Sequence, residues 1–310
     1  MKNKKNVIVT GGAGFLGSTL VPELIKAGYS VHVIDSLVSG KRECVPEGAT
    51  LHEIDVRDEG LVDLFKRIAE KEGGIYGVFH LAALPRVQFS IDHPAQSHSV
   101  NVDGMRNVLE ASRQAGVRRL VYSASSSAYG DQDALPLHEG LVPSPMSPYA
   151  LQKYMGEHMA RNYSIHYGLP TVSLRYFNIY GPNFDPNGPY AQALGRFIDM
   201  KKQGKPLTVT GDGLQTRDIV HARDVARANI LALESDKVGK GEVMNIGSGR
   251  NPRILDLAKM ISPDVVFIAP RVEPRHSKAD IRKAKELLGW EPAITLEEGI
   301  AELKKLHGIE

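Results

Sequence analysis

Val7-Ile8-Val9-Thr10-Gly11-Gly12-Ala13-Gly14-Phe15-Leu16-Gly17 is the stretch of sequence that decides the fold. A short run of β-branched residues, typical of a buried strand, leads directly into glycines spaced as Gly-x-x-Gly-x-x-Gly. Glycines at these positions permit a tight turn and a close approach of backbone N–H groups to a ligand. With a helix opening behind the turn, the stretch predicts a site for the diphosphate of a dinucleotide.

The end of the next predicted strand carries a carboxylate, Asp35. A carboxylate in this place accepts hydrogen bonds from ribose hydroxyls and repels a 2′-phosphate, so the sequence favours NAD over NADP. Lys41 and Arg42 lie nearby and keep NADP open as the alternative. Asp55 and Val56 end a third strand-like run and suit a contact with the adenine edge, although a surface turn has the same pattern.

Short apolar runs alternate with segments of helical length, which indicates βαβ units, a parallel sheet and a doubly wound α/β fold. After Asn178, loops rich in Gly, Pro and Asp indicate a smaller lobe built around a ligand. We expect a nucleotide-binding domain over residues 1–177, to which 220–248 returns, and a smaller substrate-binding domain over 178–310. The predicted strands are 6–10, 30–34, 76–81, 119–123 and 171–175, followed by a helix over 220–233 and a strand over 242–246.

The composition argues against several classes of protein. The formal charge of the 310 residues is +2 with basic residues scattered, so no nucleic-acid or membrane partner is expected. A single cysteine, Cys44, excludes an internal disulfide, and the eleven histidines are dispersed, so no metal site is expected. The apolar run Val7 to Val9 is too short for a signal peptide, and we expect a cytoplasmic protein.

Tyr149 and Lys153 are spaced to lie on one face of a helix, one turn apart. A cation close to a phenol lowers its pKa, and such a phenol can act as a base. Ser147 and Pro148 are typical of an N-cap and a first helical residue, so Tyr149 falls in the first turn, where the helix dipole also favours negative charge. Chance packing of Tyr beside a solvated Lys is the alternative.

A serine cluster, Ser123-Ala124-Ser125-Ser126-Ser127, closes another predicted strand at the carboxyl edge, where open α/β sheets bind ligands. By itself it is also compatible with an ordinary turn-rich loop. Beside a dinucleotide and a Tyr-x-x-x-Lys pair, it supplies a hydroxyl that can relay or orient the proton of a substrate alcohol.

With these motifs the chain resembles the extended short-chain dehydrogenases/reductases, and among them the nucleotide-sugar epimerases of the UDP-galactose 4-epimerase type. The resemblance covers nearly the whole sequence. Its motifs are Thr10 to Gly17, His80-Leu81-Ala82-Ala83, Asn101-Val102-Asp103-Gly104, the serine cluster, Ser147-Pro148-Tyr149 with Lys153, Leu174-Arg175-Tyr176-Phe177-Asn178, and Thr216-Arg217-Asp218.

The resemblance implies a catalytic triad of Ser125, Tyr149 and Lys153, with Lys153 also bound to the nicotinamide ribose. Asn101 would fix a bent helix or a water path behind the triad. NAD would be held by the triad residues Tyr149 and Lys153 and by Gly11, Gly14, Phe15, Leu16, Gly17, Asp35, Ser36, Gly40, Asp55, Val56, Leu81, Ala82, Ala83, Asn101, Ser123 and Tyr176.

The resemblance also implies a UDP-sugar as substrate and a homodimer as the assembly. Arg271 is followed by Glu273-Pro274, where the family often has Gly-Asp, so the backbone there departs from the pattern. The substrate would be held by Ser125, Ser126, Ser127, Tyr149, Asn178, Tyr190, Ala191, Arg217, Arg271 and Ser277. The two arginines would pair with the diphosphate.

The implied reaction is 4-epimerisation through a 4-keto sugar with NAD regenerated in each cycle. Related dehydratases and decarboxylases place an acid after the catalytic hydroxyl, whereas this chain has Ser126. Ser277 stands where a bulky aromatic excludes N-acetyl groups in such epimerases, so we expect UDP-GlcNAc and UDP-GalNAc to be accepted alongside UDP-glucose and UDP-galactose. A UDP-uronate 4-epimerase, another NDP-sugar oxidoreductase or dehydratase, and a non-enzymatic nucleotide sensor remain as alternatives.

Overall fold

The central sheet has seven parallel strands, and the glycine-rich turn directly follows one of them, β1. The computed structural model describes residues 5–184, 193–270 and 273–309. The strand order β10-β6-β5-β4-β1-β2-β3 reverses direction around β1, so the predicted doubly wound α/β fold is confirmed. The strands are β1 (Asn6–Thr10), β2 (Ser30–Asp35), β3 (Ala49–Glu53), β4 (Gly77–His80), β5 (Leu120–Ser125), β6 (Thr171–Tyr176) and β10 (Lys240–Ile246).

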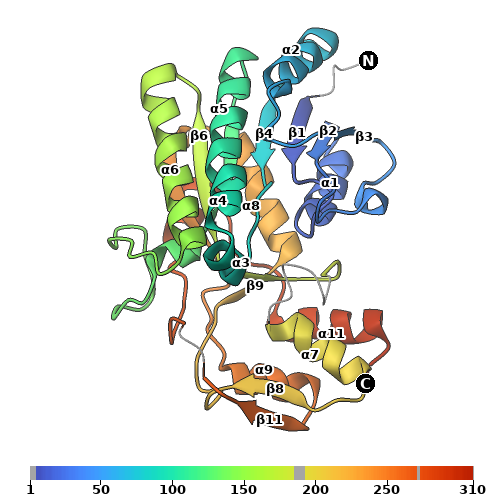
Figure 1. Ribbon diagram of the computed structural model, residues 1–310, viewed down its shortest axis with the longest axis vertical. Coiled ribbons are helices and arrows are strands. Elements are labelled where there is room, and N and C mark those ends of the chain that lie inside the picture. The colour runs from blue at the N-terminus through green and yellow to red at the C-terminus, as the bar shows by residue number, and fades with distance from the viewer. Residues whose placement is uncertain (1–4, 185–192, 271–272, 310) are drawn as a thin grey trace.

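Helices cover both faces of this sheet (Figure 1). Along β1, Val7 and Val9 join one hydrophobic core and Ile8 joins the other, because successive strand residues point to opposite faces. The apolar run that opens the sequence is therefore buried on both sides, as parallel sheets require. One face carries α2 (Leu61–Glu72), α5 (Gly104–Gln114) and α6 (Pro148–Tyr167); the other carries α1 (Gly17–Lys26), α8 (Ala222–Glu234) and α10 (Arg282–Leu288).

A second group of elements has its own core, in which Leu194, Phe197, Leu257 and Leu303 are buried (Figure 1). Its two-stranded sheet pairs β8 (Leu207–Thr210) with β11 (Val265–Ile268), and its helices are α7 (Ala193–Lys202), α9 (Ile254–Ile261) and α11 (Leu296–His307). Between the two groups, β7 (Asn178–Tyr180) pairs with β9 (Ile219–His221). The helix predicted over 220–233 thus begins later, at Ala222, because Val220 and His221 belong to β9.

The remaining elements are short and follow the strand ends. They are η1 (Arg42–Cys44), α3 (Val87–Asp92), α4 (Pro94–His98), the π-helical turn η2 (Ser99–Asp103) and η3 (Ser126–Tyr129).

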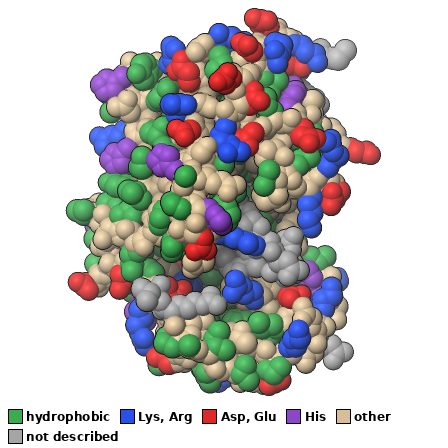
Figure 2. Space-filling view, viewed as in Figure 1, with side chains coloured by type: hydrophobic (Ala, Val, Ile, Leu, Met, Phe, Trp, Pro, Cys, Tyr) green, Lys and Arg blue, Asp and Glu red, His purple; other side chains and the backbone are tan. Residues whose placement is uncertain are grey.

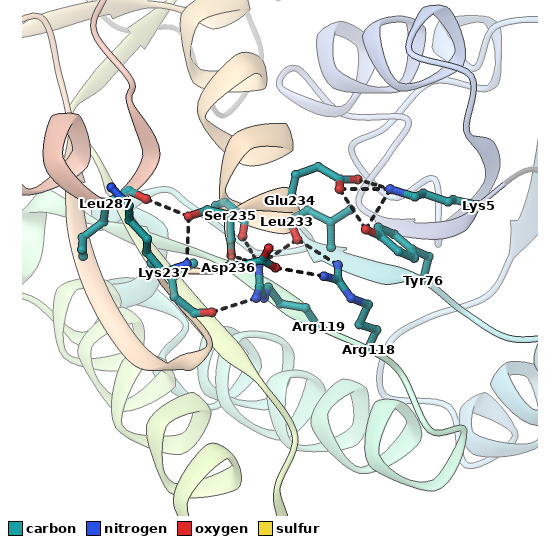
Figure 3. A network of polar contacts seen from close by, with 12 residues as sticks. Lys5, Tyr76, Arg118, Arg119, Leu233, Glu234, Ser235, Asp236, Lys237 and Leu287 are labelled. Atoms are coloured by element: carbon teal, nitrogen blue, oxygen red, sulfur yellow. Dashed lines mark hydrogen bonds and ion pairs between the residues drawn. The ribbon is translucent and has the colours of Figure 1, made fainter.

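The amino end of the sheet is fastened to α8 by charged side chains (Figure 3). Arg119 is buried and donates hydrogen bonds to the carbonyl oxygens of Leu233, Ser235 and Val238, at 2.8, 2.6 and 2.7 Å. Leu233 lies in the last turn of α8, and Ser235 and Val238 follow it, so these carbonyls have no partner N–H within the helix. Lys5 pairs with Glu234 at 3.0 Å in the same network. These contacts occupy the amino end of the sheet, opposite the carboxyl ends where ligands bind in this class of fold.

The described surface carries charged side chains of both signs. Lys and Arg side chains are interspersed with Asp and Glu over the face in Figure 2. Among the helices that the structure describes, none is long and apolar enough to cross a membrane. The described residues also contain no group of three or more His, Cys, Asp or Glu side chains placed to hold a metal ion.

Candidate active site

A cavity lies at the carboxyl ends of β1, β2 and β4, and we call it the cofactor-side cavity. It brings together ten of the predicted cofactor residues, which come from four separate loops. They are Gly11, Gly14, Asp35, Ser36, Gly40, Asp55, Val56, Leu81, Ala82 and Ala83. The sequence reasoning missed other lining residues, of which Gln96 lies in α4, Val100 lies in η2, and Val38, Ser39 and Leu84 follow strand ends.

The glycine-rich turn is packed too closely for side chains. A Cβ on Gly11 would lie 2.7 Å from the Ala82 nitrogen, and the residue has a φ of +72° that favours glycine. A Cβ on Gly17 would lie 2.5 Å from the Gly11 oxygen, so the first helical turn approaches the strand end directly. Such a cradle of bare backbone before a helix fits a dinucleotide diphosphate. Phe15 and Leu16 are buried beneath this turn and position it.

Asp35 lies at the end of β2 with its carboxylate beside the cavity. Its Oδ2 accepts a hydrogen bond from the Ala13 nitrogen at 3.0 Å, and its Oδ1 accepts one from the Leu37 nitrogen at 2.9 Å. Burial raises the pKa of the carboxyl, and these two backbone hydrogen bonds lower it part of the way. Each oxygen keeps one lone pair. The geometry therefore fits a ribose with two free hydroxyls.

Asp55 is held within its own loop. Its two carboxylate oxygens accept hydrogen bonds from Arg57 Nε and Nη2 at 2.9 and 2.7 Å. The Arg57 guanidinium holds the pKa of this carboxyl below its usual range. The Asp55 side chain thus shapes the loop, and the neighbouring Val56 presents an apolar surface to the cavity.

The candidate triad lies at the end of β5. Lys153 is buried and donates a hydrogen bond of 2.8 Å from Nζ to the Ser123 oxygen. The Tyr149 hydroxyl is hydrogen-bonded to Ser125, whose Oγ also accepts a bond of 2.8 Å from Ser127 Oγ. Ser126 directly follows Ser125 and is the first residue of η3, so the residue after the candidate catalytic hydroxyl is not an acid. The structure thus brings the Tyr-x-x-x-Lys pair and the serine cluster into one constellation.

The start of α6 explains where Tyr149 lies. Ser147 Oγ accepts a hydrogen bond from the Ala150 nitrogen at 3.2 Å, and Pro148 is the first helical residue, as predicted. The Tyr149 nitrogen donates to Ser90 Oγ at 3.0 Å, a partner that the sequence reasoning missed. A cap and an external anchor together fix the first turn of the helix.

The expected lowering of the Tyr149 pKa is wrong for this structure. Burial raises the pKa of Tyr149 to about 12, and the hydrogen bond with Ser125 offsets only part of this rise. Burial also lowers the pKa of Lys153 to about 7, against a smaller opposing effect of Glu157. The physical reason is that the burial of Lys153 and the partial burial of Tyr149 disfavour both charged forms, and that Lys153 Nζ is bound to a backbone oxygen.

Asn101 and Tyr176 lie behind the triad. Asn101, in the π-helical turn η2, bonds the backbone of Leu84 through both side-chain atoms and donates to Gln152 Oε1 at 2.8 Å. It therefore ties the loop of the cofactor-side cavity to the helix of Tyr149. Tyr176 donates to Asn229 Oδ1 at 2.8 Å and is buried. Gln152 was missed, although its place between Tyr149 and Lys153 was a usable signal.

A second cavity lies beyond β7, on the side of the smaller group of elements. Asn178 and Arg217 line it, together with Tyr180, Phe197 and Glu273. Arg217 Nη2 is paired with a Glu273 carboxylate oxygen at 3.0 Å, and its Nη1 donates to the Thr216 oxygen at 2.9 Å. This guanidinium is held in place by its neighbours and faces the cavity from a half-buried position.

The other predicted substrate residues are placed as follows. Ser277 lies beside the loop 216–218: its Oγ accepts a hydrogen bond from the Asp218 nitrogen at 3.2 Å, and its nitrogen donates to the Thr216 oxygen. Ala279, two residues further on, packs with Tyr129 and Phe177 at the edge of the serine cluster. Tyr190, Ala191 and Arg271 lie outside the described residues.

The sheet order sets how these parts are arranged. β5 lies between β4, whose end lines the cofactor-side cavity, and β6, which leads to Asn178 in the second cavity. The triad at the end of β5 is therefore placed between two cavities. This arrangement suits a hydride and proton exchange between two bound molecules.

Comparison with known proteins places the chain among sugar-nucleotide enzymes. A family model described as the NAD dependent epimerase/dehydratase family matches residues 7–247. The chain is 36% identical over 304 residues to a UDP-glucose 4-epimerase of Mycolicibacterium smegmatis, covering 95% of this chain and 96% of the relative. It is 33% identical over 313 residues to a UDP-glucuronate 4-epimerase of Thermodesulfobacterium geofontis, covering 94% and 93%.

Solved structures agree with these relatives. A UDP-glucose 4-epimerase of Thermotoga maritima with UDP-glucose is similar at a TM-score of 0.90 and 38% identity, covering 97% of this chain and 98% of that one. A UDP-N-acetylglucosamine 4-epimerase of Methanobrevibacter ruminantium, in complex with UDP-N-acetylmuramic acid, is similar at 0.91 and 34%, covering 98% of each chain.

Proposed function

The chain belongs to the NAD-dependent epimerase/dehydratase family, and we propose that within this family it interconverts UDP-glucose with UDP-galactose and UDP-GlcNAc with UDP-GalNAc. It is an isomerase of the UDP-sugar 4-epimerase group, and its cofactor is NAD. The observation that carries the substrate proposal is the triad at the end of β5, with Ser126 in place of an acid.

The triad residues supply the proton chemistry of a sugar alcohol. The residues that line the cofactor-side cavity would hold NAD, which would supply the acceptor, and later the donor, of the sugar's hydride. Tyr149 takes the hydroxyl proton as the base, and Ser125 orients that hydroxyl through its bond to Tyr149. In the proposed catalytic form, a charged Lys153 one helical turn from Tyr149 favours the phenolate, against the burial that otherwise raises the Tyr149 pKa. The pKa values of about 12 for Tyr149 and about 7 for Lys153 both favour the neutral pair. The reactive Tyr⁻/Lys⁺ form has the same number of protons, because it differs from the neutral pair only by transfer of one proton from Tyr149 to Lys153.

The absence of an acid beside Ser125 favours epimerisation over elimination. Loss of water from a sugar needs a general acid at the leaving hydroxyl, and Ser126 has no proton of suitable pKa. The 4-keto sugar is then left to turn over and to receive the hydride on its other face. A UDP-uronate is the second candidate substrate, because a UDP-glucuronate 4-epimerase is among the similar relatives.

The second cavity is the proposed place of the UDP group. Asn178 and Arg217 line it and would bind the diphosphate, with Ser126 and Ser127 against the sugar. A guanidinium presents a bidentate fork to phosphate oxygens. Tyr190, Ala191 and Arg271 complete the proposed set from outside the described residues. The small side chain of Ser277 supports the proposal that N-acetylated sugars are accepted.

We also propose a cytoplasmic homodimer that forms through α5 and α6. Leu151, Ile165 and Tyr167 on α6 are exposed, an arrangement that suits a helical interface. Hydrophobic and histidine side chains gather in Figure 2 on the side where Figure 1 places α6.

Incubation with a panel of UDP-hexoses, UDP-N-acetylhexosamines and UDP-uronates, with products separated by chromatography, tests the function. We expect C4 epimers from the first two groups without net formation of NADH. Turnover of the uronates alone would replace the proposed substrates with the second candidate. If no C4 epimer forms from any sugar, the proposed function is wrong.

A further inference from the structure

A buried ion pair lies directly behind the candidate triad. Glu157 stands one helical turn after Lys153 on α6, and its two carboxylate oxygens accept hydrogen bonds from Arg175 on β6. Arg175 Nε donates to Oε1 at 2.9 Å and Nη2 donates to Oε2 at 2.7 Å. Both side chains are only 4% exposed. The pair is therefore bidentate and removed from solvent, in the geometry of a charge-assisted double hydrogen bond.

Arg175 is in turn held from two further elements. Its guanidinium lies over the Tyr129 ring of η3, 4.5 Å from the ring centre. Tyr129 donates a hydrogen bond of 2.8 Å to Asn245 Oδ1, and Asn245 is the register partner of Arg175 on β10. Arg175 Nη1 has no hydrogen-bond partner in the part of the chain that the structure describes. The Glu157 carboxylate is thus fixed by elements that reach across the sheet.

Stability alone gives little reason for such a pair. Removing two charges from water is costly, and apolar residues of similar volume often stabilise a fold equally well. The location of the pair is more informative than its strength. Glu157 is the carboxylate whose charge acts on the buried Lys153, Arg175 donates to both of its oxygens, and Lys153 Nζ is bound to the Ser123 oxygen.

The other groups around Lys153 carry no negative charge at neutral pH. His80 on β4 is buried, and burial lowers its pKa to about 3, so it is neutral. The Tyr122 ring on β5 lies 5.1 Å from Nζ. The groups that face Lys153 are Tyr149 and Glu157 from α6, Tyr122 and the Ser123 oxygen from β5, His80 from β4, and Arg175 from β6, behind Glu157.

We propose that Glu157 and Arg175 are a positioning pair for the Lys153 ammonium. Glu157 supplies negative potential to Lys153. Arg175 binds both carboxylate oxygens of Glu157, so that Lys153 does not form an ion pair with Glu157. This role rests on the proposed function, in which Lys153 acts as a cation beside Tyr149. Neither residue touches the reacting atoms. The pair raises the pKa of Lys153 above the value that burial alone would give, while leaving the amine bound to the end of β5.

Two variants and one control test the proposal. Glu157→Gln removes the charge with little change of shape, and Glu157→Leu with Arg175→Met removes the whole pair. Because apolar replacement of a buried ion pair often preserves stability, the double variant decides the matter if the single variant fails to fold. Asp224→Asn is the matched control, since Asp224 is a buried, Arg-paired carboxylate on α8, on the opposite face of the sheet.

In both Glu157 variants we expect the alkaline limb of kcat/KM to move to lower pH by about one unit, because the ammonium loses its nearby negative charge. Above that limb, kcat/KM should fall roughly tenfold relative to the original protein. Asp224→Asn should leave the limb in place. A double variant that folds and keeps the original limb would overturn the proposal.

A direct titration separates this proposal from the proposed function. NMR of selectively labelled lysine, with the Lys153 signal assigned by Lys153→Met, follows the Lys153 pKa without any turnover. We expect the pKa to fall in both Glu157 variants and to stay unchanged in Asp224→Asn. If no UDP-sugar is epimerised but the Lys153 pKa falls, only the proposed function fails. An unchanged Lys153 pKa in the Glu157 variants refutes the positioning role, whatever the activity.

Discussion

Lys153 Nζ lies 2.8 Å from the Ser123 oxygen, so the buried amine of α6 is bound to the end of β5, two residues before the serine that contacts Tyr149. This bond couples the catalytic helix to the strand that carries the hydroxyl relay. It also explains why the Tyr149 pKa is not lowered by its neighbour on the helix. Lys153 Nζ is bound to this backbone oxygen, lies near the Tyr122 ring and experiences the negative charge of Glu157.

Tyr149→Phe should nearly abolish epimerisation. Removing a base that is positioned for proton transfer typically lowers kcat by about 10²–10⁴-fold, and the cofactor should remain bound because the cofactor-side cavity is untouched. Chromatography of the sugar products and the dinucleotide content of the purified protein provide the two measurements. Tyr154→Phe on the same helix is the control and should keep its activity. A Tyr149→Phe protein with undiminished kcat would exclude the phenol as the base.

Ser277→Tyr should discriminate between substrates. A bulky ring beside the loop 216–218 should exclude UDP-GlcNAc and UDP-GalNAc, while UDP-glucose and UDP-galactose continue to turn over. The Ser277 hydroxyl bonds the Asp218 nitrogen, so Ser277→Ala controls for loss of that bond. The ratio of kcat/KM for the two sugar groups is the quantity to compare. An equal loss for both groups in the tyrosine variant contradicts a role in size selection.

Asp35→Asn should weaken the preference for NAD. The carboxylate is the negative charge at the end of β2 that would repel a 2′-phosphate. Losing a hydrogen bond to a charged group costs about 1.5–3 kcal/mol, so NAD affinity should fall roughly ten- to a hundredfold, whereas NADP affinity should rise. Calorimetric titration of both dinucleotides measures this change. Asp63→Asn, on the exposed side of α2, serves as the control. Parallel losses for NAD and NADP would mean that Asp35 acts only through the fold.

Lys153→Met should stabilise the fold, most of all at and below neutral pH. The folded pKa of Lys153 is about 7, below its ordinary value of 10.5, so between these values the unfolded chain binds more protons than the folded one. Stability of the original protein therefore rises with pH across this window, by up to about 1.4 kcal/mol per pH unit, and the variant lacks this slope. Urea unfolding at several pH values measures the difference, with exposed Lys71→Met as the control. A constant difference between pH 7 and 10 would show that Lys153 does not titrate in the fold as described.

The local parts of the site could be predicted from the sequence because each is determined by a short range of residues. A β-branched run before Gly11, Gly14 and Gly17 determined the strand, the turn and the helix that follow. Ser147 and Pro148 determined where α6 begins, and the spacing of Tyr149 and Lys153 placed them on one helix. In each case the deciding interactions lie within one helical turn or one strand, so neighbouring residues carry the information.

The tertiary structure decided what surrounds those groups. It buried Lys153 and part of Tyr149, and this burial shifts both pKa values toward the neutral forms, against the expectation from their spacing. It also placed Arg175 of β6 on Glu157 and bound the Lys153 amine to Ser123. Burial and pairing depend on elements that meet only across the sheet, and the local sequence pattern carries no record of them. The sequence by itself determined the fold and the reactive groups, and long-range packing decided their charge.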